Sequence, residues 1–173
     1  QALAIKPDYA EAHLNLALLL LLRGNLKESW NEYEWRSKIK NSGTRILPIE
    51  MWSGASLRGK SIVIYAEQGI GDEIVFASCI SDLLEQSPNK LFLECDPRLE
   101  ALFARSFPGV HVHGKLKDMD FSWLSDIAQP DYALPIGSLP QFFRNQVGDF
   151  PERDGYLTPQ PNLVEKWTQR LSG

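Results

Sequence analysis

The sequence has little cysteine, no excess of positive charge and no long apolar run, and each absence excludes a class of protein. Its 173 residues include two cysteines, Cys79 and Cys95, which are too few for a disulfide framework and form no Cys-x-x-Cys zinc pair. We expect both to be reduced thiols in the core, as in a cytoplasmic protein. The formal net charge of −4 gives no support for nucleic acid or an anionic membrane as the main partner.

We predict neither a targeting segment nor a membrane-spanning segment in this sequence. No basic stretch followed by an apolar core stands at the N-terminus, so no signal peptide is predicted. The most apolar run, residues 14–22, is interrupted by Asn15 and falls well short of the roughly 20 residues that a membrane span needs. We therefore predict a buried helix there, no membrane span and a cytoplasmic location.

Helix- and strand-breaking residues over 41–60 divide the chain into two parts. Asn41-Ser42-Gly43, Pro48, Ser53-Gly54 and Gly59 fall in this stretch. Apolar residues recur at helical spacing before it, and strand patterns alternate with helix patterns after it. We predict a helical unit over 1–40, a linker over 41–60 and a Rossmann-like domain over 61–173.

The helical unit is expected to be two antiparallel helices. Asp8 is placed to cap the first helix, and Gly24 supplies the turn that ends it. The second helix runs from Leu26 to about Lys38. The apolar positions at helical spacing are Ala10, Leu14, Ala17 and Leu21 in the first helix and Leu26, Trp30 and Tyr33 in the second.

The second part has the alternation of a parallel sheet with helices on both faces, which places it in the α/β class. Residues 61–66 are β-branched and apolar on both sides, as in a buried strand. Three further strands are predicted at 90–95, 110–112 and 131–135. Helices are predicted after residue 72, from 97, over 139–145 and over 162–171.

The loop after the first predicted strand is the strongest candidate site. Glu67, Gln68, Gly69 and Gly71 lead into a helix that has Asp72 near its start. Such a loop lies at the carboxyl edge of an open α/β sheet, where these folds bind ligands. A third glycine of the dinucleotide fingerprint is absent, and the acidic residues repel a pyrophosphate. We therefore predict no cofactor, and a neutral, hydroxyl-bearing ligand such as a sugar. The alternative is that Asp72 only caps its helix and the glycines make a tight turn.

Several motifs resemble a known family. Trp52-Ser53-Gly54, the loop 67–73, Glu94-Cys95-Asp96-Pro97 and Ile136-Gly137-Ser138 are similar to bacterial proteins that join tetratricopeptide repeats to a glycosyltransferase module. That module is of the heptosyltransferase or O-linked N-acetylglucosaminyltransferase type, with the two-Rossmann-domain fold called GT-B. The helical unit has residues at the repeat positions of the family: His13, Leu16, Ala17, Leu20, Ser29 and Tyr33.

The resemblance implies an inverting transfer from a nucleotide-sugar without a metal. Asp72 would be the catalytic base that deprotonates an acceptor hydroxyl. Our candidate substrate-binding residues are Glu67, Gln68, Gly69, Gly71 and Ser138. The repeats would bind a protein or peptide acceptor. The donor would bind a second Rossmann domain that this chain lacks, so we expect the chain alone to be an inactive, acceptor-side fragment.

One other interpretation of the whole chain remains open at this point. In this interpretation the chain is a non-catalytic protein-binding scaffold built from the repeat and the Rossmann-like domain.

The histidines and the acidic loop give no metal site. His111 and His113 share one face of a strand, but their spacing matches no metal motif that we recognise. The acidic residues Asp118, Asp120 and Asp126 are expected to form a solvated loop, because they lack a calcium-loop register.

Overall fold

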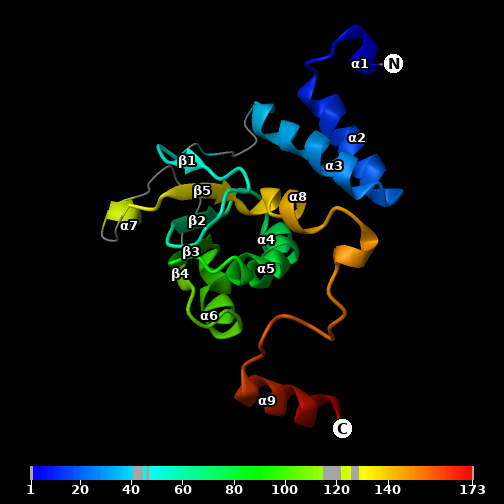
Figure 1. The fold of residues 1–173 in the computed structure, drawn as a ribbon. Coiled ribbons are helices and arrows are strands. Elements are labelled where there is room, and N and C mark those ends of the chain that lie inside the picture. Colours follow the sequence, from blue (N-terminus) through cyan, green and yellow to red (C-terminus); the bar gives the residue numbers. More distant parts are fainter. Residues whose placement is uncertain (1, 41–44, 46, 115–121, 126–128, 173) are drawn as a thin grey trace.

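The computed structural model of the chain is an α/β fold in which a parallel five-stranded sheet is flanked by helices (Figure 1). The structure describes residues 2–40, 45, 47–114, 122–125 and 129–172. The α/β class predicted from the sequence is thereby confirmed. The acidic loop residues Asp118, Asp120 and Asp126 lie outside the described residues.

The N-terminal helices form a packed pair. After the short α1 (Ala2–Ile5), α2 (Ala10–Leu22) is joined to α3 (Leu26–Tyr33) by a turn in which Gly24 has a φ of +76°. The two helices approach closely at small residues, where the Ser29 hydroxyl donates to the carbonyl of Ala17. The prediction that Asp8 caps α2 is wrong, because the cap position is Tyr9 and makes no side-chain capping bond.

The second helix ends sooner than its sequence pattern indicates. A 3₁₀ segment, η1 (Glu34–Lys38), replaces its last turns. The 3₁₀ helix has a tighter winding than the α-helix, and this changes the direction of the side chains that follow Tyr33. Arg36 lies in η1 and is buried.

All neighbouring strands of the sheet are parallel, and their order is β1-β5-β2-β3-β4. This order is compatible with a Rossmann-like arrangement. The edge strand β1 lies within the stretch predicted to be a linker, so the linker prediction misses a part of the sheet. The strands are β1 (Glu50–Met51), β2 (Ser61–Tyr65), β3 (Lys90–Cys95), β4 (His111–Gly114) and β5 (Tyr132–Pro135).

Helical segments connect the strands and cover the sheet. The helix predicted after residue 72 is interrupted by a 3₁₀ turn, which separates α4 from α5. Asp96 caps α6 by accepting from the backbone N–H of Arg98 at 2.9 Å. The segments are α4 (Ile70–Phe76), η2 (Ala77–Cys79), α5 (Ile80–Glu85), α6 (Pro97–Ser106), α7 (Ser122–Ser125), η3 (Ile136–Ser138), α8 (Pro140–Phe143), η4 (Val147–Asp149) and α9 (Pro161–Leu171).

The two faces of the sheet have separate cores, as strand alternation requires. Ile62 and Ile64 of β2 join the larger core with α3, α4, α5 and α6. Val63 and Tyr65 point to the opposite face, where they pack in a smaller core that includes Leu124 of α7. The buried β-branched run of β2 therefore supports packing on both sides of the sheet.

The last helix stands apart from both cores. No residue of α9 is buried, and Figure 1 shows it displaced from the sheet. Its large side chain Trp167 is 49% exposed. In the part of the chain that the structure describes, no helix has the length and apolar character that crossing a membrane requires.

Candidate functional site at the carboxyl edge of the sheet

The candidate site lies where the strand order reverses. From β2 the chain runs through α4 and α5 to β3 on one side, whereas β5 pairs with β2 on the other side. The loops after β2 and β5 therefore leave adjacent strands at the same edge, and the backbone N–H of Gly137 in the second loop donates to Glu67 in the first. Open α/β sheets bind ligands at the edge where the strand order reverses in this way. Among the predicted site residues, Glu67, Gln68 and Gly69 lie in the loop after β2, Gly71 and Asp72 lie in the first turn of α4, and Ser138 lies in η3 after β5. Glu67 and Ser138 are brought together, because both contact Arg36.

The rim of the site is the start of α4. Gly69 is the cap residue of this helix, and its backbone N–H donates to Oδ2 of Asp72 at 3.0 Å. Gly69, Gly71 and Asp72 are all exposed. The capping contact that the sequence left as an alternative is therefore present. It occupies one oxygen of the Asp72 carboxylate, and the catalytic role of this exposed group stays a prediction.

Glu67 lies below this rim and is 4% exposed. Its carboxylate accepts from Nε of Arg36 at 3.1 and 3.2 Å, and from Nη2 at 2.7 Å. The backbone N–H of Gly137, from the loop after β5, donates to the same carboxylate at 3.2 Å. Glu67 thus joins the two loops and the helical unit. It supports the site from within and has little exposed surface, and its role in binding a substrate stays a prediction.

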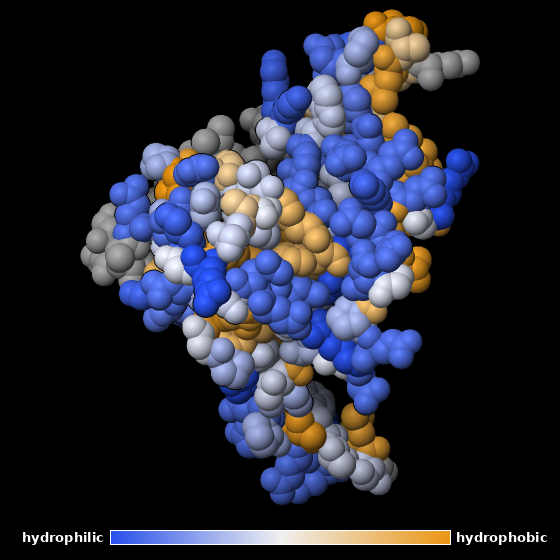
Figure 2. All heavy atoms as spheres, viewed as in Figure 1, coloured by the Kyte–Doolittle hydropathy of each residue, from blue (hydrophilic) through white to orange (hydrophobic). Residues whose placement is uncertain are grey.

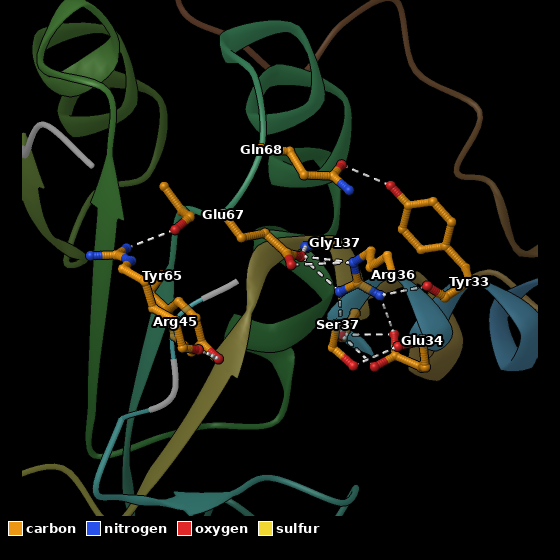
Figure 3. Close-up of polar contacts among 11 residues, drawn as sticks. Tyr33, Glu34, Arg36, Ser37, Arg45, Tyr65, Glu67, Gln68 and Gly137 are labelled. Carbon is orange, nitrogen blue, oxygen red and sulfur yellow. Dashed lines mark hydrogen bonds and ion pairs between the residues drawn. The ribbon is translucent and has the colours of Figure 1, made fainter. Parts of the chain in front are cut away.

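Arg36 is the centre of this cluster, and it was not among the residues predicted from the sequence (Figure 3). Besides Glu67, its guanidinium donates from Nη1 to the Tyr33 carbonyl at 3.2 Å and to Glu34 at 2.7 Å, and from Nη2 to Ser138 at 2.7 Å. Nε, Nη1 and Nη2 all have acceptors, as burial of a guanidinium requires. One signal was present: Arg36 follows Tyr33 by three residues, which is the spacing of neighbours on a helix surface.

Ser138 and Gln68 are also tied to the helical unit. The buried hydroxyl of Ser138 donates to the Glu34 carboxylate at 2.8 Å, while its oxygen accepts from Arg36. The side-chain oxygen of Gln68 accepts from the Tyr33 hydroxyl at 2.8 Å. In Figure 3, Tyr33 and Gln68 face each other from α3 and from the loop after β2. We call Tyr33, Glu34, Arg36, Glu67, Gln68, Gly137 and Ser138 the Arg36 cluster.

The Arg36 cluster carries more negative than positive formal charge. Burial by itself lowers the pKa of Arg36, but the carboxylates of Glu67 and Glu34 outweigh it and raise the pKa above its ordinary value. Burial raises the pKa of Tyr33, so its hydroxyl stays protonated and donates. By formal charge, the Arg36 cation faces Glu34 and Glu67, and Asp72 adds a third carboxylate nearby. This arrangement disfavours an anionic ligand group.

Gly137 is required by the close packing of the cluster. A Cβ at this position would lie 2.6 Å from Oε1 of Glu67 and 3.3 Å from Nη2 of Arg36. The first distance is far inside van der Waals contact, and both atoms belong to a buried ion pair that has little room to move. The glycine therefore allows the loop after β5 to approach the carboxylate.

A second buried ion pair lies beside the end of β2. Arg45 pairs with Glu94 of β3 and also donates from Nη2 to the carbonyl of Ala66 at 2.7 Å. The indole N–H of Trp123 donates to the Glu94 carboxylate at 3.2 Å. The backbone carbonyl of Arg45 accepts from the Tyr65 hydroxyl at 3.2 Å. The carboxyl end of β2 is thus held from two directions, by Arg36 and by Arg45 (Figure 3).

The remaining candidate residues have structural surroundings. His113 stacks on Trp123 with ring centroids 4.5 Å apart, and His111 lies 5.2 Å from Phe92. Within the described ranges, no three His, Cys, Asp or Glu side chains come together as a metal-binding group. Cys79 and Cys95 are free and buried. Burial raises the pKa of Cys79 to about 11, which keeps this thiol protonated and unreactive.

Comparison with known proteins gives a partial match. The chain is 34% identical over 176 aligned residues to Protein FlbA of Caulobacter vibrioides, a match that covers 95% of this chain. The chain spans only 29% of the length of that relative. No family profile matches the sequence, and no solved structure matches it.

This comparison corrects the resemblance drawn from the sequence motifs. The assignment to bacterial tetratricopeptide-repeat proteins with a glycosyltransferase module is wrong, because the relative found is Protein FlbA, a different protein. Neither the repeat nor the glycosyltransferase module has support from a family match. The helix pair of α2 and α3 is therefore described here as a helix pair only.

Proposed function

We propose that the chain forms the acceptor side of an enzyme that transfers a sugar from a nucleotide-sugar to a hydroxyl group. The observation that carries the proposal is the convergence of two loops at the point where the strand order reverses, with Asp72 exposed on the rim. The excess of carboxylates at this place supports an uncharged, hydroxyl-bearing ligand over a phosphate-bearing one. We propose that the nucleotide-sugar binds outside this chain.

In the proposed reaction, Asp72 accepts the proton of the acceptor hydroxyl. The acceptor oxygen forms a bond to the anomeric carbon of the sugar as the bond from that carbon to the nucleotide phosphate breaks. The electron pair of the broken bond remains on the phosphate oxygen. A base of this kind must lie within hydrogen-bond reach of the hydroxyl. The second Asp72 oxygen, beyond the capping contact, is the atom we assign to this role.

We further propose that the acceptor is a protein or peptide that contacts the helix pair. The Rossmann-like domain over 61–173 would then supply the chemistry, and the unit over 1–40 would supply part of the acceptor surface. The sheet order supports the first assignment. The ties of Tyr33, Glu34 and Arg36 to the loops of the site support the second, because they place α3 and η1 beside the site.

The test is the substitution Asp72→Asn in the protein that contains this chain. Asparagine keeps an oxygen that can accept from the Gly69 N–H, so the cap is retained while the base is lost. We expect transfer of labelled sugar to fall by at least about 10²-fold, with the midpoint of thermal unfolding nearly unchanged. We expect Asp72→Ala to lower sugar transfer as much as Asp72→Asn does. It should also destabilise the protein by roughly 0.5–1 kcal/mol, because it removes the capping contact to Gly69.

Asp149→Asn is the matched control. Asp149 makes the same kind of contact at the start of η4, where its carboxylate accepts from the backbone N–H of Asn145 at 2.8 Å and of Gln146 at 3.1 Å. It belongs to neither loop of the candidate site. Transfer should survive this change at the wild-type rate. If Asp72→Asn retained full transfer, Asp72 would be a capping residue only.

A second candidate function is that of a non-catalytic protein-binding scaffold. Exposed leucines on α2 favour it: Leu18 is 48%, Leu19 is 58% and Leu22 is 84% exposed. Figure 2 shows apolar surface along the edge of the helix pair. Such a scaffold would bind its partner with the same affinity before and after the substitution Asp72→Asn, and it would show no transfer in the wild type.

A further inference from the structure

We propose that the helix pair is a constituent of the ligand site, and that Arg36 is the positioning residue that holds the two loops of the site in register. This inference rests on the proposed function for its catalytic consequence, but its structural content is independent of that function. It assigns a role to a residue far in sequence from both loops: Arg36 is 31 residues from Glu67 and 102 residues from Ser138.

The contacts show why Arg36 does more than fill a buried space. One guanidinium edge contacts Glu67 on the loop after β2, at 3.1 Å and 2.7 Å from Nε and Nη2. Nη2 also reaches Ser138 on the loop after β5 at 2.7 Å. A single rigid, planar group thereby sets the separation of two loops that leave different strands. Lysine has neither the fork geometry nor enough donors to do the same.

Glu67 relays this constraint to the backbone. It accepts from the Gly137 N–H at 3.2 Å, and it immediately precedes the residues that lead to the rim. The Tyr33 hydroxyl holds the next residue, Gln68, at 2.8 Å. Asp72 itself is exposed and is fixed by its bond to Gly69. The position of the Asp72 carboxylate therefore depends on a loop whose first two side chains are held by α3 and η1.

The contacts of Arg36 also couple the helix pair to the candidate site. A partner that shifts α3 or η1 must move Arg36, and Arg36 cannot move without releasing Glu67 or Ser138. The helix pair is thus mechanically coupled to the site. If an acceptor bound to the helices and shifted them, the Arg36–Glu67 ion pair would transmit the movement to the loop that leads to Asp72.

The experiment compares Arg36→Lys with Arg144→Lys by hydrogen exchange of backbone amides in the whole chain. Arg144 is a matched control, because it is also buried and is also paired in a bidentate manner, with Asp82 at 2.9 and 2.7 Å. It contacts neither loop of the site. We expect Arg36→Lys to speed exchange by about tenfold or more at 67–72 and 136–138, while Arg144→Lys leaves these amides at the wild-type rate.

Ser138→Ala keeps the test decisive if Arg36→Lys folds poorly. It removes only the hydroxyl that links Arg36 to Glu34, so we expect faster exchange at 136–138 and a smaller effect at 67–72. Equal exchange of both loops in wild type and in these variants would overturn the inference. So would equal effects of Arg36→Lys and Arg144→Lys, because the role of Arg36 would then be general stabilisation.

Transfer assays separate this inference from the proposed function. If the wild-type protein transfers sugar, Arg36→Lys should lower kcat while the KM for the nucleotide-sugar stays unchanged, because the donor is proposed to bind elsewhere. If the wild-type protein transfers no sugar, the proposed function fails, and the exchange result still decides whether Arg36 positions the loops. A rise in donor KM without a change in loop exchange would contradict the positioning role.

Discussion

At the scale of single residues, a few buried polar side chains determine the geometry of the candidate site. Arg36 is 3% exposed and Glu67 is 4% exposed, so removal of Arg36 would leave the Glu67 carboxylate away from water without its cationic partner. Their pairing is possible because the loop after β5 approaches without a side chain at Gly137. Gly137 is therefore a sensitive position of the cluster although it carries no charge.

Gly137→Ala should destabilise the protein by about 1–3 kcal/mol in urea unfolding, because the new Cβ would stand 2.6 Å from Oε1 of Glu67. Gly148→Ala is the control, since nothing lies within 4 Å of a Cβ built at that position. We expect the control to be neutral or slightly stabilising. A Gly137→Ala protein as stable as wild type would show that the Arg36–Glu67 pair has room to shift.

The surroundings of His13 predict that the free energy of unfolding depends on pH. Its Nε2 lies 2.7 Å from the Pro7 carbonyl, its Nδ1 contacts the Glu32 carboxylate, and its ring stacks on Trp35 with centroids 3.7 Å apart. Both nitrogens face acceptors, which favours the protonated ring. The Pro7 carbonyl and then Glu32 raise the pKa of His13, against the opposing effects of burial and of Lys38.

Because the folded-state pKa is raised, the stabilisation by His13 is complete below the unfolded-state pKa of about 6.5 and is lost as pH rises through the folded-state value. The difference in unfolding free energy between wild type and His13→Gln should therefore be larger at pH 6 than at pH 9. Chemical denaturation at both pH values measures it, with Glu32→Gln as a check on the partner. A pH-independent difference would exclude an imidazolium.

At the scale of elements, α3 does most to join the helix pair to the sheet. The indole N–H of Trp30 donates to the Arg144 carbonyl at 2.6 Å, and its ring packs edge-on to Tyr33 in the larger core. The helix α9 is the opposite case, because all of its residues are exposed. Sequence periodicity does not separate the two helices, since both have an apolar stripe at the same spacing.

Two tryptophan substitutions test this contrast. Trp30→Ala should cost about 3–5 kcal/mol, because it removes a side chain that is 7% exposed and leaves the Arg144 carbonyl without its donor. Trp167→Ala should cost less than about 0.5 kcal/mol, because Trp167 is 49% exposed on α9. Urea unfolding of both variants gives the comparison. A large loss for Trp167→Ala would mean that α9 packs on the rest of the chain in solution.

Sequence patterns predict the long buried strands of the sheet but miss its short edge strand and the 3₁₀ segment. β2 and β3 could be predicted because their buried runs are long and rich in apolar residues. β1 has only Glu50 and Met51, both exposed, so no periodicity marks it, and only its pairing with Tyr132 and Ala133 defines it. The 3₁₀ segment at Glu34–Lys38 was likewise missed, because its residues continue a helical pattern.

At the scale of the whole molecule, the helix pair and the sheet are one packed body in the described part of the chain. Trp30 and Tyr33 share the larger hydrophobic core with Ile62 and Ile64 of β2. The Arg36 cluster adds polar contacts across the same junction. The boundary at 41–60 is thus a change in sequence pattern that is crossed by extensive tertiary contacts, and a ligand at the carboxyl edge would meet residues from both sides of it.

The sequence by itself determined the α/β class, the strands β2 to β5 and the glycine-containing loop with Asp72, because burial periodicity and turn chemistry are local properties of the chain. Only the tertiary structure decided that Glu67 is paired inside the protein and that Ser138 bonds to Glu34. It alone placed Arg36 between the two loops. These contacts join residues 31 to 104 positions apart, and local patterns specify which faces are buried but not which distant partner each face will meet.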